Sequence, residues 1–418
     1  MIEKRKDQRN PRSSASHKNR ENQRNQRVSE ATSASHQKGV FAGRVGVQQR
    51  VLPAYRAGFF DALAEACQGG LSVFAGEPRP DESIAVSSGL SQARYAPARN
   101  RHFLRVSSPL FLLWQDNILG WLESWDPDVL ILEANPRYLS SWLAVRWMHV
   151  KCRPVIGWGL GAPPGNPTSL IGKFQVAFQK GLRRGFLLSC DALIAYSRRG
   201  ADQYHAEGFP ADRIFIAPNA VALRPTEPPP ERSPDYGQRP TVLFVGRLQK
   251  RKRIDLLLRA CAALPEAQQP RLWLIGEGPA KAEFQSLAES IYPLAEFPGA
   301  RHGEALKPYF LSADLFVLPG TGGLAVQEAM AHGLPVIVAE GDGTQEDLVR
   351  PGNGWSIPSD DVVALQEALR EALSDPARLR RMGRESFRLV SEEINLEAML
   401  AVFLRALQSV TPPEKAAK

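Results

Sequence analysis

Residues 314–333 read Asp-Leu-Phe-Val-Leu-Pro-Gly-Thr-Gly-Gly-Leu-Ala-Val-Gln-Glu-Ala-Met-Ala-His-Gly and predict a strand, a turn and a helix in succession. The apolar run at 314–318 is typical of a short buried strand. The turn at 319–323 contains three glycines, which allow backbone conformations that other residues avoid. Residues 324–330 have apolar positions at helical spacing, and Gly333 ends the helix.

This arrangement is suited to binding an anion. The free amides and the dipole at the start of a helix favour negative charge. Glu328 lies one turn into the predicted helix, where its carboxylate would repel a phosphate. We therefore expect Glu328 to hold neutral hydroxyl groups, such as those of a ribose, beside an anion bound at the turn.

Length and composition are those of a globular enzyme of two or three domains, with 418 residues, 43% of them apolar and 23% charged. No run of about 18 apolar residues is present, so no membrane-spanning helix is expected. The four cysteines are far apart and the seven histidines are scattered. Neither a disulfide framework nor a metal site is expected, and a reducing cytoplasm fits.

The net charge of +8 is concentrated at the start of the chain. Residues 1–39 contain ten Lys or Arg against four acids, which accounts for +6 of the total. This segment has few apolar residues and is predicted to be a disordered basic tail. Contact with anionic lipid or nucleic acid is one interpretation, and a solvated tail or a misassigned start codon is the other; no specific nucleic-acid partner is expected.

Strands alternate with helices along the first half. We expect strands at 40–47, 71–75, 128–132, 154–158, 191–196 and 213–217, and helices at 59–66, 109–125 and 138–149. The polar stretch at 77–101 is expected to form loops. Such alternation predicts a parallel sheet with helices on both faces.

A proline-rich linker at 223–239 separates this half from a second one of similar pattern. The second half has expected strands at 241–245, 271–275, 314–318 and 335–339, expected helices at 254–264 and 306–313, a turn at 353–355 and a largely helical stretch at 360–410. The predicted domains are 40–222 and 240–384, followed by residues 385–418, whose helix is expected to return to the first domain.

Polar groups follow several predicted strands of the first half. They lie in the loop at 48–56, in the segment 133–137 and in the glycine-rich loop at 157–161. Ligands of open α/β sheets bind beyond the carboxyl ends of the strands, so these loops are candidates for binding a substrate.

One loop of the second half, residues 246–253, is strongly cationic. Arg247 and Lys252 follow a predicted strand, and Arg and Lys suit a diphosphate, particularly one that leaves as an anion. A solvated basic helix start is the alternative. Cations are mildly unfavourable at a helix N-terminus, which favours the functional interpretation.

The segment 169–188 is both basic and apolar. It is interpreted either as a helix on an anionic membrane surface or as a core helix with a solvated basic edge. The sequence contains no P-loop, no Gly-x-Gly-x-x-Gly after the first strand and no Gly-x-Ser-x-Gly elbow. Kinases, ATPases, dinucleotide dehydrogenases and serine hydrolases of that type therefore lose their main support.

Together these motifs resemble the family 4 glycosyltransferases over residues 40–410. The most specific matches are Val245-Gly246-Arg247-Leu248 with Lys252, Gly276-Glu277-Gly278-Pro279, and the segments 313–319 and 323–336. The resemblance implies a GT-B fold, in which two Rossmann-like doubly wound domains face a cleft. It also implies a nucleotide-diphosphate sugar donor, no metal or other cofactor, and retention of anomeric configuration.

The resemblance assigns roles to individual residues. It implies that Arg247 and Lys252 hold the diphosphate and stabilise the leaving group, and that Glu328 holds the ribose. Glu133 is the third predicted catalytic residue, as the ionisable group nearest to the place where the family often has a histidine. The donor-binding set it implies is Gly246, Arg247, Lys252, Gly276, His302, Gly322, Gly323, Leu324 and Glu328. The acceptor-binding set is Arg50, Tyr55, Arg56, Asn135, Arg137 and Trp158.

The sequence departs from the family pattern at two positions. The family has paired glutamates with seven residues between them, and counting back eight from Glu328 gives Gly320. The contact of that first glutamate with the donor sugar is therefore missing or moved, and Asp342 and Glu346 are candidate substitutes. The family also often has a histidine after the strand at 128–132, where this chain has Glu133.

The leading prediction is a cytoplasmic retaining glycosyltransferase, at the inner face of the membrane if its basic surfaces touch lipid. It would transfer sugar to a glycan or lipid-linked acceptor of a surface polysaccharide, lipopolysaccharide or other glycoconjugate. The alternatives are a non-catalytic nucleotide-sugar-binding protein and a GT-B epimerase or phosphorylase. Donor base, sugar and acceptor stay open.

Overall fold

The structure is a computed structural model. It describes residues 40–411 except residues 80, 81, 83, 105–107, 109, 110, 163–169 and 230. The predicted basic tail at 1–39 lies outside the described residues.

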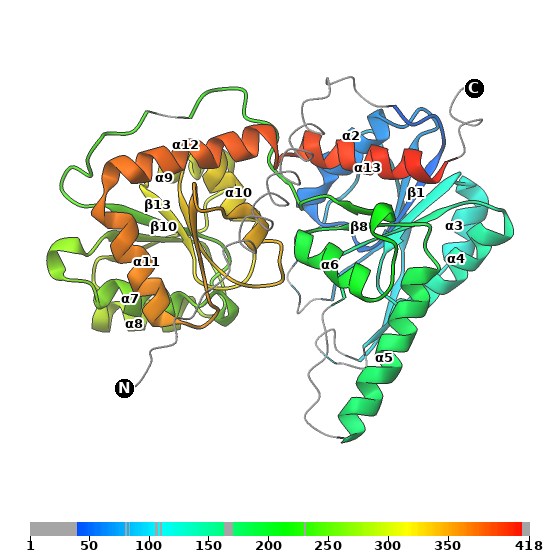
Figure 1. Cartoon of the computed structure of the whole chain (residues 1–418), viewed down its shortest axis with the longest axis horizontal. Coiled ribbons are helices and arrows are strands. Elements are labelled where there is room, and N and C mark those ends of the chain that lie inside the picture. The colour runs from blue at the N-terminus through cyan, green and yellow to red at the C-terminus, as the bar shows by residue number, and fades with distance from the viewer. Residues whose placement is uncertain are drawn as a thin grey trace, which may run out of the picture. The chain divides into compact units, whose positions relative to one another are not determined.

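The first half contains a parallel sheet of seven strands in the order β3-β2-β1-β6-β7-β8-β9 (Figure 1). The strands are β1 (Val45–Val51), β2 (Leu71–Gly76), β3 (Arg94–Ala98), β6 (Val129–Glu133), β7 (Val155–Gly159), β8 (Ala192–Ala195) and β9 (Ile214–Ile216). The chain winds outward from β1 to β3 and then outward again from β6 to β9. The predicted doubly wound fold is therefore confirmed for this half.

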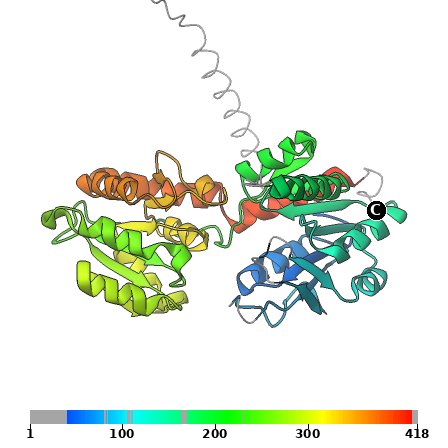
Figure 2. The same cartoon turned by 90° about the horizontal axis from the view of Figure 1, so that it is seen from below.

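Helices cover both faces of this sheet, as Figure 2 shows. On one face lie α2 (Ala57–Glu65) and α13 (Leu396–Val410), and on the other lie α3 (Ile118–Trp125), α4 (Leu139–Val150), α5 (Leu170–Leu188) and α6 (Arg198–Ala206). Side chains of a strand alternate between the two cores: Val129 and Ile131 face the first, and Leu130 and Leu132 face the second. Among the described residues, no helix is both long and apolar enough to cross a membrane.

The prediction of loops at 77–101 was wrong, because β3 and β4 (Asn100–Phe103) lie at its end. β3 pairs in parallel with β2 at the edge of the sheet, and most of its residues are exposed or half-buried. An edge strand open to solvent needs no continuous apolar run, so periodicity does not reveal it.

The prediction of one helix over 109–125 was also wrong. Leu112–Gln115 form β5, which pairs antiparallel with β4, and only Ile118–Trp125 are helical. Asn117 adopts a left-handed conformation (φ 63°) between them. The antiparallel pairing with the preceding strand β4 overrides the apolar pattern of residues 112–115.

The second half contains a parallel sheet of six strands in the order β12-β11-β10-β13-β14-β15. These are β10 (Thr241–Val245), β11 (Arg271–Ile275), β12 (Ala295–Gly299), β13 (Leu315–Leu318), β14 (Val336–Ala339) and β15 (Gly354–Ile357). The helices are α7 (Ile254–Ala262), α8 (Lys281–Ile291), α9 (Lys307–Ser312), α10 (Leu324–Ala331), α11 (Val362–Ser374) and α12 (Pro376–Glu392). Of the turn expected at 353–355, Asn353 lies in a turn, whereas Gly354 and Trp355 begin the edge strand β15, which pairs with β14.

The last helix returns to the first half. α13 packs against α2, β8 and β9, and its residues Met399, Phe403 and Leu407 are buried in the first core. Phe403 contacts the rings of Phe59 and Trp158 edge-on, with 4.8 Å between ring centroids in both pairs. Asn395 caps the helix by accepting a hydrogen bond from the amide of Ala398 at 2.8 Å.

We predict that Phe403→Ala destabilises the first half. The substitution removes a fully buried ring from between two aromatic neighbours, and such a change costs about 3–5 kcal/mol. Urea unfolding of the full chain measures the effect, with Gln408→Ala on the exposed side of the same helix as the control. Equal midpoints for the two variants would contradict the contribution of α13 to this core.

Candidate functional site

The predicted donor loops lie at the topological switch point of the second sheet. β10 and β13 are neighbours there, and the chain leaves them in opposite directions, to β11 and to β14. The cationic loop follows β10 and the glycine turn follows β13. Adjacent loops that diverge in this way open the crevice in which ligands of doubly wound sheets bind.

Lys252 joins these two loops. It ends the short 3-10 turn Lys250–Lys252, and its Nζ donates a hydrogen bond to the carbonyl oxygen of Thr321 at 2.6 Å. The amide of Thr321 donates to the carbonyl oxygen of Arg251 at 3.1 Å. A side chain and a main-chain bond therefore hold the glycine turn against the cationic loop.

The ammonium group of Lys252 is partly removed from water. Burial lowers the pKa of Lys252 to about 8, and the positive charge of Arg251 acts in the same direction. A Cβ placed on Gly322 would lie 2.2 Å from Lys252 Nζ, so the absence of a side chain there makes room for the cation. An anion bound at this point would meet a charge that is little shielded by solvent.

Gly320 explains why the first glutamate of the family motif is absent. A Cβ at this position would lie 2.3 Å from the carbonyl oxygen of Arg251 and 2.8 Å from Cα of Lys252. These are backbone atoms, so rotation of a side chain cannot relieve the overlap. In this structure position 320 is a point of contact between two loops and has no room for a carboxylate.

Gln345 supports the glycine turn from a third loop. Its side chain is 1% exposed, and its Oε1 accepts a hydrogen bond from the amide of Gly322 at 2.9 Å. Its Nε2 donates to the carbonyl oxygens of Gly320 and Ala339. The Gly322 amide, predicted to bind the donor, is thus engaged within the protein, and Gly323 and Leu324 begin α10 beside it. Gln345 was not predicted as a site residue, because its only sequence signal is its position in a glycine-containing loop.

Gly276 allows the loop after β11 to touch the loop after β10. Its φ is +149°, and a Cβ there would lie 1.9 Å from the carbonyl oxygen of Gly246. Arg247 follows Gly246 directly and is half-buried. Gly246, Lys252 and Gly276 are therefore close neighbours, and Arg247 is adjacent to Gly246 in the chain.

Glu328 and His302 also lie close enough to interact. Burial raises the pKa of Glu328, and the charges of protonated His332 and His302 act in the opposite direction. Glu328 is half-buried one turn into α10, whereas His302 is exposed ahead of a short 3-10 turn at Gly303–Ala305. A half-buried carboxylate retains acceptor atoms for hydroxyl groups of a ligand.

The two acids suggested as substitutes for the missing glutamate have local roles instead. Both carboxylate oxygens of Glu346 accept hydrogen bonds from the amides of its own loop, Gly341 at 3.0 Å and Gly343 at 2.9 Å. Asp342 accepts from the amide and hydroxyl of Thr344. Their positions do not favour the substitution hypothesis.

The first sheet places Glu133 at its own switch point, between β1 and β6. Glu133 Oε1 accepts a hydrogen bond from the amide of Arg50 at 2.5 Å, and the hydroxyl of Tyr138 bonds to the same carboxyl group. Burial raises the pKa of Glu133, while the Arg50 amide and the charges of Arg50 and Arg56 oppose that shift. The buried amide of Gln48 accepts from the Glu133 amide at 3.2 Å and fixes the end of the strand.

Arg56 is a buried cation surrounded by aromatic rings. It is 5% exposed, its guanidinium carbon lies 4.4 Å from the ring centroid of Trp158 and 5.1 Å from that of Tyr196, and its Nη2 donates to the Tyr196 hydroxyl at 2.8 Å. Trp158 is 1% exposed and packs in the core. Its burial argues against direct contact with an acceptor. The Trp158 ring instead packs against the guanidinium group of Arg56.

The other predicted acceptor residues lie around the same strand ends. Arg50 pairs with Glu82 at 2.8 Å, and Tyr55 is 45% exposed next to Arg56. Asn135 Oδ1 accepts hydrogen bonds from the amide and Nε of Arg137. The cations of this group are therefore oriented by neighbouring polar or aromatic side chains.

Residues of the second half contact the first half at α6 and at residues 219–221, which precede the linker. Asp347 Oδ2 accepts a hydrogen bond from the amide of Arg198 at 2.7 Å, at the N-terminus of α6. The buried side chain of Gln327 bonds to the Asn219 carbonyl at 2.6 Å and the Val221 amide at 3.1 Å. Gln327 is adjacent to Glu328 on α10, so this contact reaches the predicted donor helix.

We predict that Gly320→Glu fails to restore a sugar contact and destabilises the second half. The new Cβ would overlap the main chain at Arg251, and overpacking of this kind costs about 1–3 kcal/mol. Gly323→Ala is the matched control, because a Cβ there would have no described atom nearer than 3.8 Å. Thermal unfolding compares the two, and an unchanged Tm for Gly320→Glu would contradict the contact.

Known proteins resemble the chain at both the sequence and the fold level. Residues 227–388 match the family model Glycosyl transferases group 1. A GDP-mannose-dependent alpha-mannosyltransferase of Mycolicibacterium smegmatis is 39% identical over 264 residues, which cover 60% of this chain and 66% of the relative. The glycosyltransferase WcaL of Escherichia coli, named for colanic acid biosynthesis, is 26% identical over 212 residues, which cover 48% of this chain and 50% of the relative. The chain thus spans about half to two thirds of the length of these relatives.

Two solved structures share the fold. The lipopolysaccharide outer core galactosyltransferase WaaB has a TM-score of 0.61 at 16% identity, covering 88% of this chain and 99% of WaaB. HepE of Anabaena, solved in complex with UDP, has a TM-score of 0.60 at 15% identity, with coverage of 88% and 99%. The chain therefore has the GT-B fold, and its residues 227–388 match the group 1 glycosyl transferases.

Proposed function

We propose that this protein is a glycosyltransferase that moves a sugar from a nucleotide-diphosphate sugar to a hydroxyl group of an acceptor. The observation that carries the proposal is the contact of Lys252 with the glycine turn, within the segment that matches the group 1 glycosyl transferases. The match supports the reaction class, and the contact supports a place for the diphosphate between two loops.

The roles of the donor residues follow from their charge and position. Arg247 and Lys252 would bind the diphosphate and stabilise the negative charge that develops as the sugar departs. The amides of Gly323 and Leu324 would add hydrogen bonds at the start of α10, and Glu328 would hold the ribose hydroxyls. Gly246 and Gly276 would let the backbone approach the nucleotide, and His302 would line the sugar side.

We further propose that transfer retains the anomeric configuration and proceeds without a metal. In such a displacement the departing diphosphate itself takes the proton of the acceptor hydroxyl. The two cations would then carry the main catalytic effect. Glu133, with a pKa raised by burial, would lie beside the acceptor as a hydrogen-bonding group.

The acceptor is proposed to bind at the ends of β1, β6 and β7. Arg50, Arg56 and Arg137 place three cations there, and Tyr55 and Asn135 add groups that can contact a glycan. The relatives named above act with GDP-mannose or in colanic acid biosynthesis, which supports a glycan or lipid-linked acceptor in glycoconjugate synthesis. Peripheral contact of α5 with an anionic membrane is proposed on its basic and apolar sequence alone.

A transfer assay tests the proposal. The purified protein is incubated with UDP-, GDP- or ADP-sugars and acceptor extract, and release of the nucleoside diphosphate is measured with EDTA present and absent. We expect release with one base, equal in both conditions. Arg247→Ala is expected to reduce transfer about a hundredfold or more, because it removes a charge that stabilises the leaving group.

Lys250→Ala serves as the control for Arg247→Ala. Lys250 is exposed in the same cationic loop and pairs with Glu283 on the surface, so its loss should leave transfer almost unchanged. Binding of a nucleotide sugar without release of diphosphate would favour a non-catalytic protein. Interconversion of the nucleotide sugar would favour an epimerase, and near-normal kcat in Arg247→Ala would contradict the role of that residue.

We also predict that donor binding weakens at alkaline pH. With a pKa of about 8, Lys252 is charged below pH 8 and loses its proton as pH rises above it. A bound diphosphate favours the charged form, so affinity is full below pH 8 and should fall above it, at most about tenfold per pH unit. Lys252→Arg keeps its charge throughout this range, so its affinity should stay constant with pH. Calorimetric titration of the matching nucleoside diphosphate from pH 7 to 9.5 measures both, and parallel profiles would contradict the assignment.

A further inference from the structure

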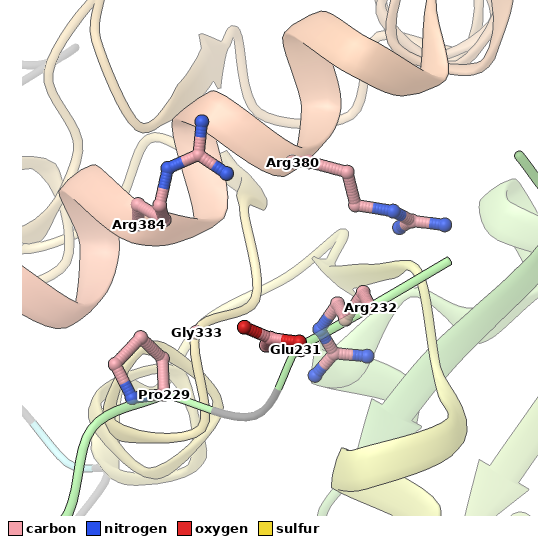
Figure 3. A pocket seen from close by; sticks show the side chains of 6 residues that line it. All are labelled: Pro229, Glu231, Arg232, Gly333, Arg380 and Arg384. Atoms are coloured by element: carbon pink, nitrogen blue, oxygen red, sulfur yellow. The ribbon is translucent and has the colours of Figure 1, made fainter. Parts of the chain in front are cut away.

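A second cationic site lies near the N-terminal ends of β13 and β14, whereas the donor loops follow the C-terminal ends of β10 and β13. It is a cavity of about 320 Å³ lined by Pro229, Glu231, Arg232, Gly333, Arg380 and Arg384. Figure 3 shows Arg380 and Arg384 on α12, and Pro229, Glu231 and Arg232 on the proline-rich linker facing them. Gly333 follows the C-terminus of α10, whereas the predicted donor atoms lie near the N-terminus of that helix.

Arg232 forms the floor of this site by capping two helices. Its guanidinium donates to the carbonyl oxygens of Phe310 at 2.8 Å, Leu311 at 2.9 Å and Ala313 at the end of α9, and to that of His332 at 3.0 Å after α10. A cation at a helix C-terminus is favourable. Burial nevertheless lowers the pKa of Arg232 to about 10, and the charge of Arg380 adds to that effect.

Arg380 is held beside it by α12. Its side chain is 9% exposed, its Nη2 pairs with Asp314 Oδ1 at 2.7 Å, and its Nε donates to the carbonyl oxygen of Ser233 at 2.8 Å. Two buried donors stay unsatisfied: Arg380 Nη1 and Arg232 Nε have no hydrogen-bond partner among the described residues. A buried donor without a partner is unfavourable, so these two groups would gain from a hydrogen-bond acceptor.

The charges around the cavity do not cancel. The three guanidinium groups of Arg232, Arg380 and Arg384 face two carboxylates, Asp314 and Glu231, and Asp314 is already engaged by Arg380 and by the Thr241 amide at 2.8 Å. Arg380 and Arg384 are one helical turn apart, so they project from the same face of α12.

We propose that this cavity binds a small phosphate-bearing anion at a site separate from the donor site. Guanidinium groups that converge from two chain segments match the several oxygens of a phosphate, which accepts paired hydrogen bonds. The cavity is at the small end of ligand sites, about 300–1,000 Å³, so it suits inorganic phosphate or a compact phosphate monoester. Glu231 lines the same cavity, and its carboxylate competes with a ligand for the arginines. A doubly charged phosphate competes for them better than a ligand with a single carboxylate would.

Phosphate binding to the full-length protein tests the proposal. Thermal unfolding and calorimetric titration are carried out with inorganic phosphate, against chloride at equal ionic strength. We expect phosphate to raise Tm above the chloride reference, because a ligand that binds the folded state stabilises it. Arg384→Gln should weaken binding about tenfold by removing a bidentate contact, and Glu231→Gln should tighten it severalfold by removing a repulsive charge.

Two further variants separate this site from other phosphate contacts. Arg381→Gln removes an exposed arginine adjacent to the site residues on the same helix and should leave phosphate affinity unchanged. Lys252→Met removes the cation proposed for the donor diphosphate, so binding that persists in it belongs to the second site. The proposal is overturned if phosphate gives no stabilisation beyond chloride, if Lys252→Met abolishes binding, or if Arg384→Gln and Arg381→Gln behave alike. These outcomes do not depend on sugar transfer.

Discussion

The second half of the protein depends on the close approach of two main-chain turns. The glycine turn after β13 and the 3-10 turn Lys250–Lys252 meet backbone to backbone at Gly320, where any side chain would intrude. This approach brings Thr321 within reach of Lys252 Nζ and places the ammonium beside Gly322. The cation is fixed near the start of α10 at the expense of its hydration, which is why its pKa falls. The same contact therefore excludes a side chain at position 320 and lowers the pKa of Lys252.

Both sheets have candidate binding residues at their switch point, but the charge of these residues differs between the two sheets. In both, polar side chains follow the pair of strands at which the winding reverses, because the loops diverge there. At the second sheet the ends carry cations and glycines that suit a diphosphate. At the first, they carry a buried carboxylate, Glu133, beside Arg50 and the aromatic surroundings of Arg56. This difference underlies the proposal that the two halves bind different ligands, a charged nucleotide and a hydroxyl-bearing acceptor.

The sequence predicted those parts of the fold that local patterns encode. The strands Thr241–Val245 and Arg271–Ile275 have the expected bounds, since a buried central strand is a continuous apolar run. The strands β3, β5 and β15 were missed, because pairing with a neighbouring strand and not periodicity creates them. The grouping of Gly246, Lys252 and Gly322 followed from motifs. The motifs did not show why position 320 is a glycine. That reason is the carbonyl oxygen of Arg251, which lies some 70 residues earlier in the chain. Trp158 was misplaced for a similar reason: its partner Phe403 is contributed by the last helix.

The return of α13 to the first core has a consequence for synthesis of the protein. Residues 396–407 complete a hydrophobic core whose other members lie between residues 41 and 220. Domains commonly fold in order as they emerge from the ribosome. Here the second sheet can fold while the α2 face of the first sheet still lacks α13. The half that is synthesised first therefore completes its core last. During that interval a long apolar surface is open to the surroundings, and a chaperone that shields it would act on the earlier half of the chain until the final helix arrives.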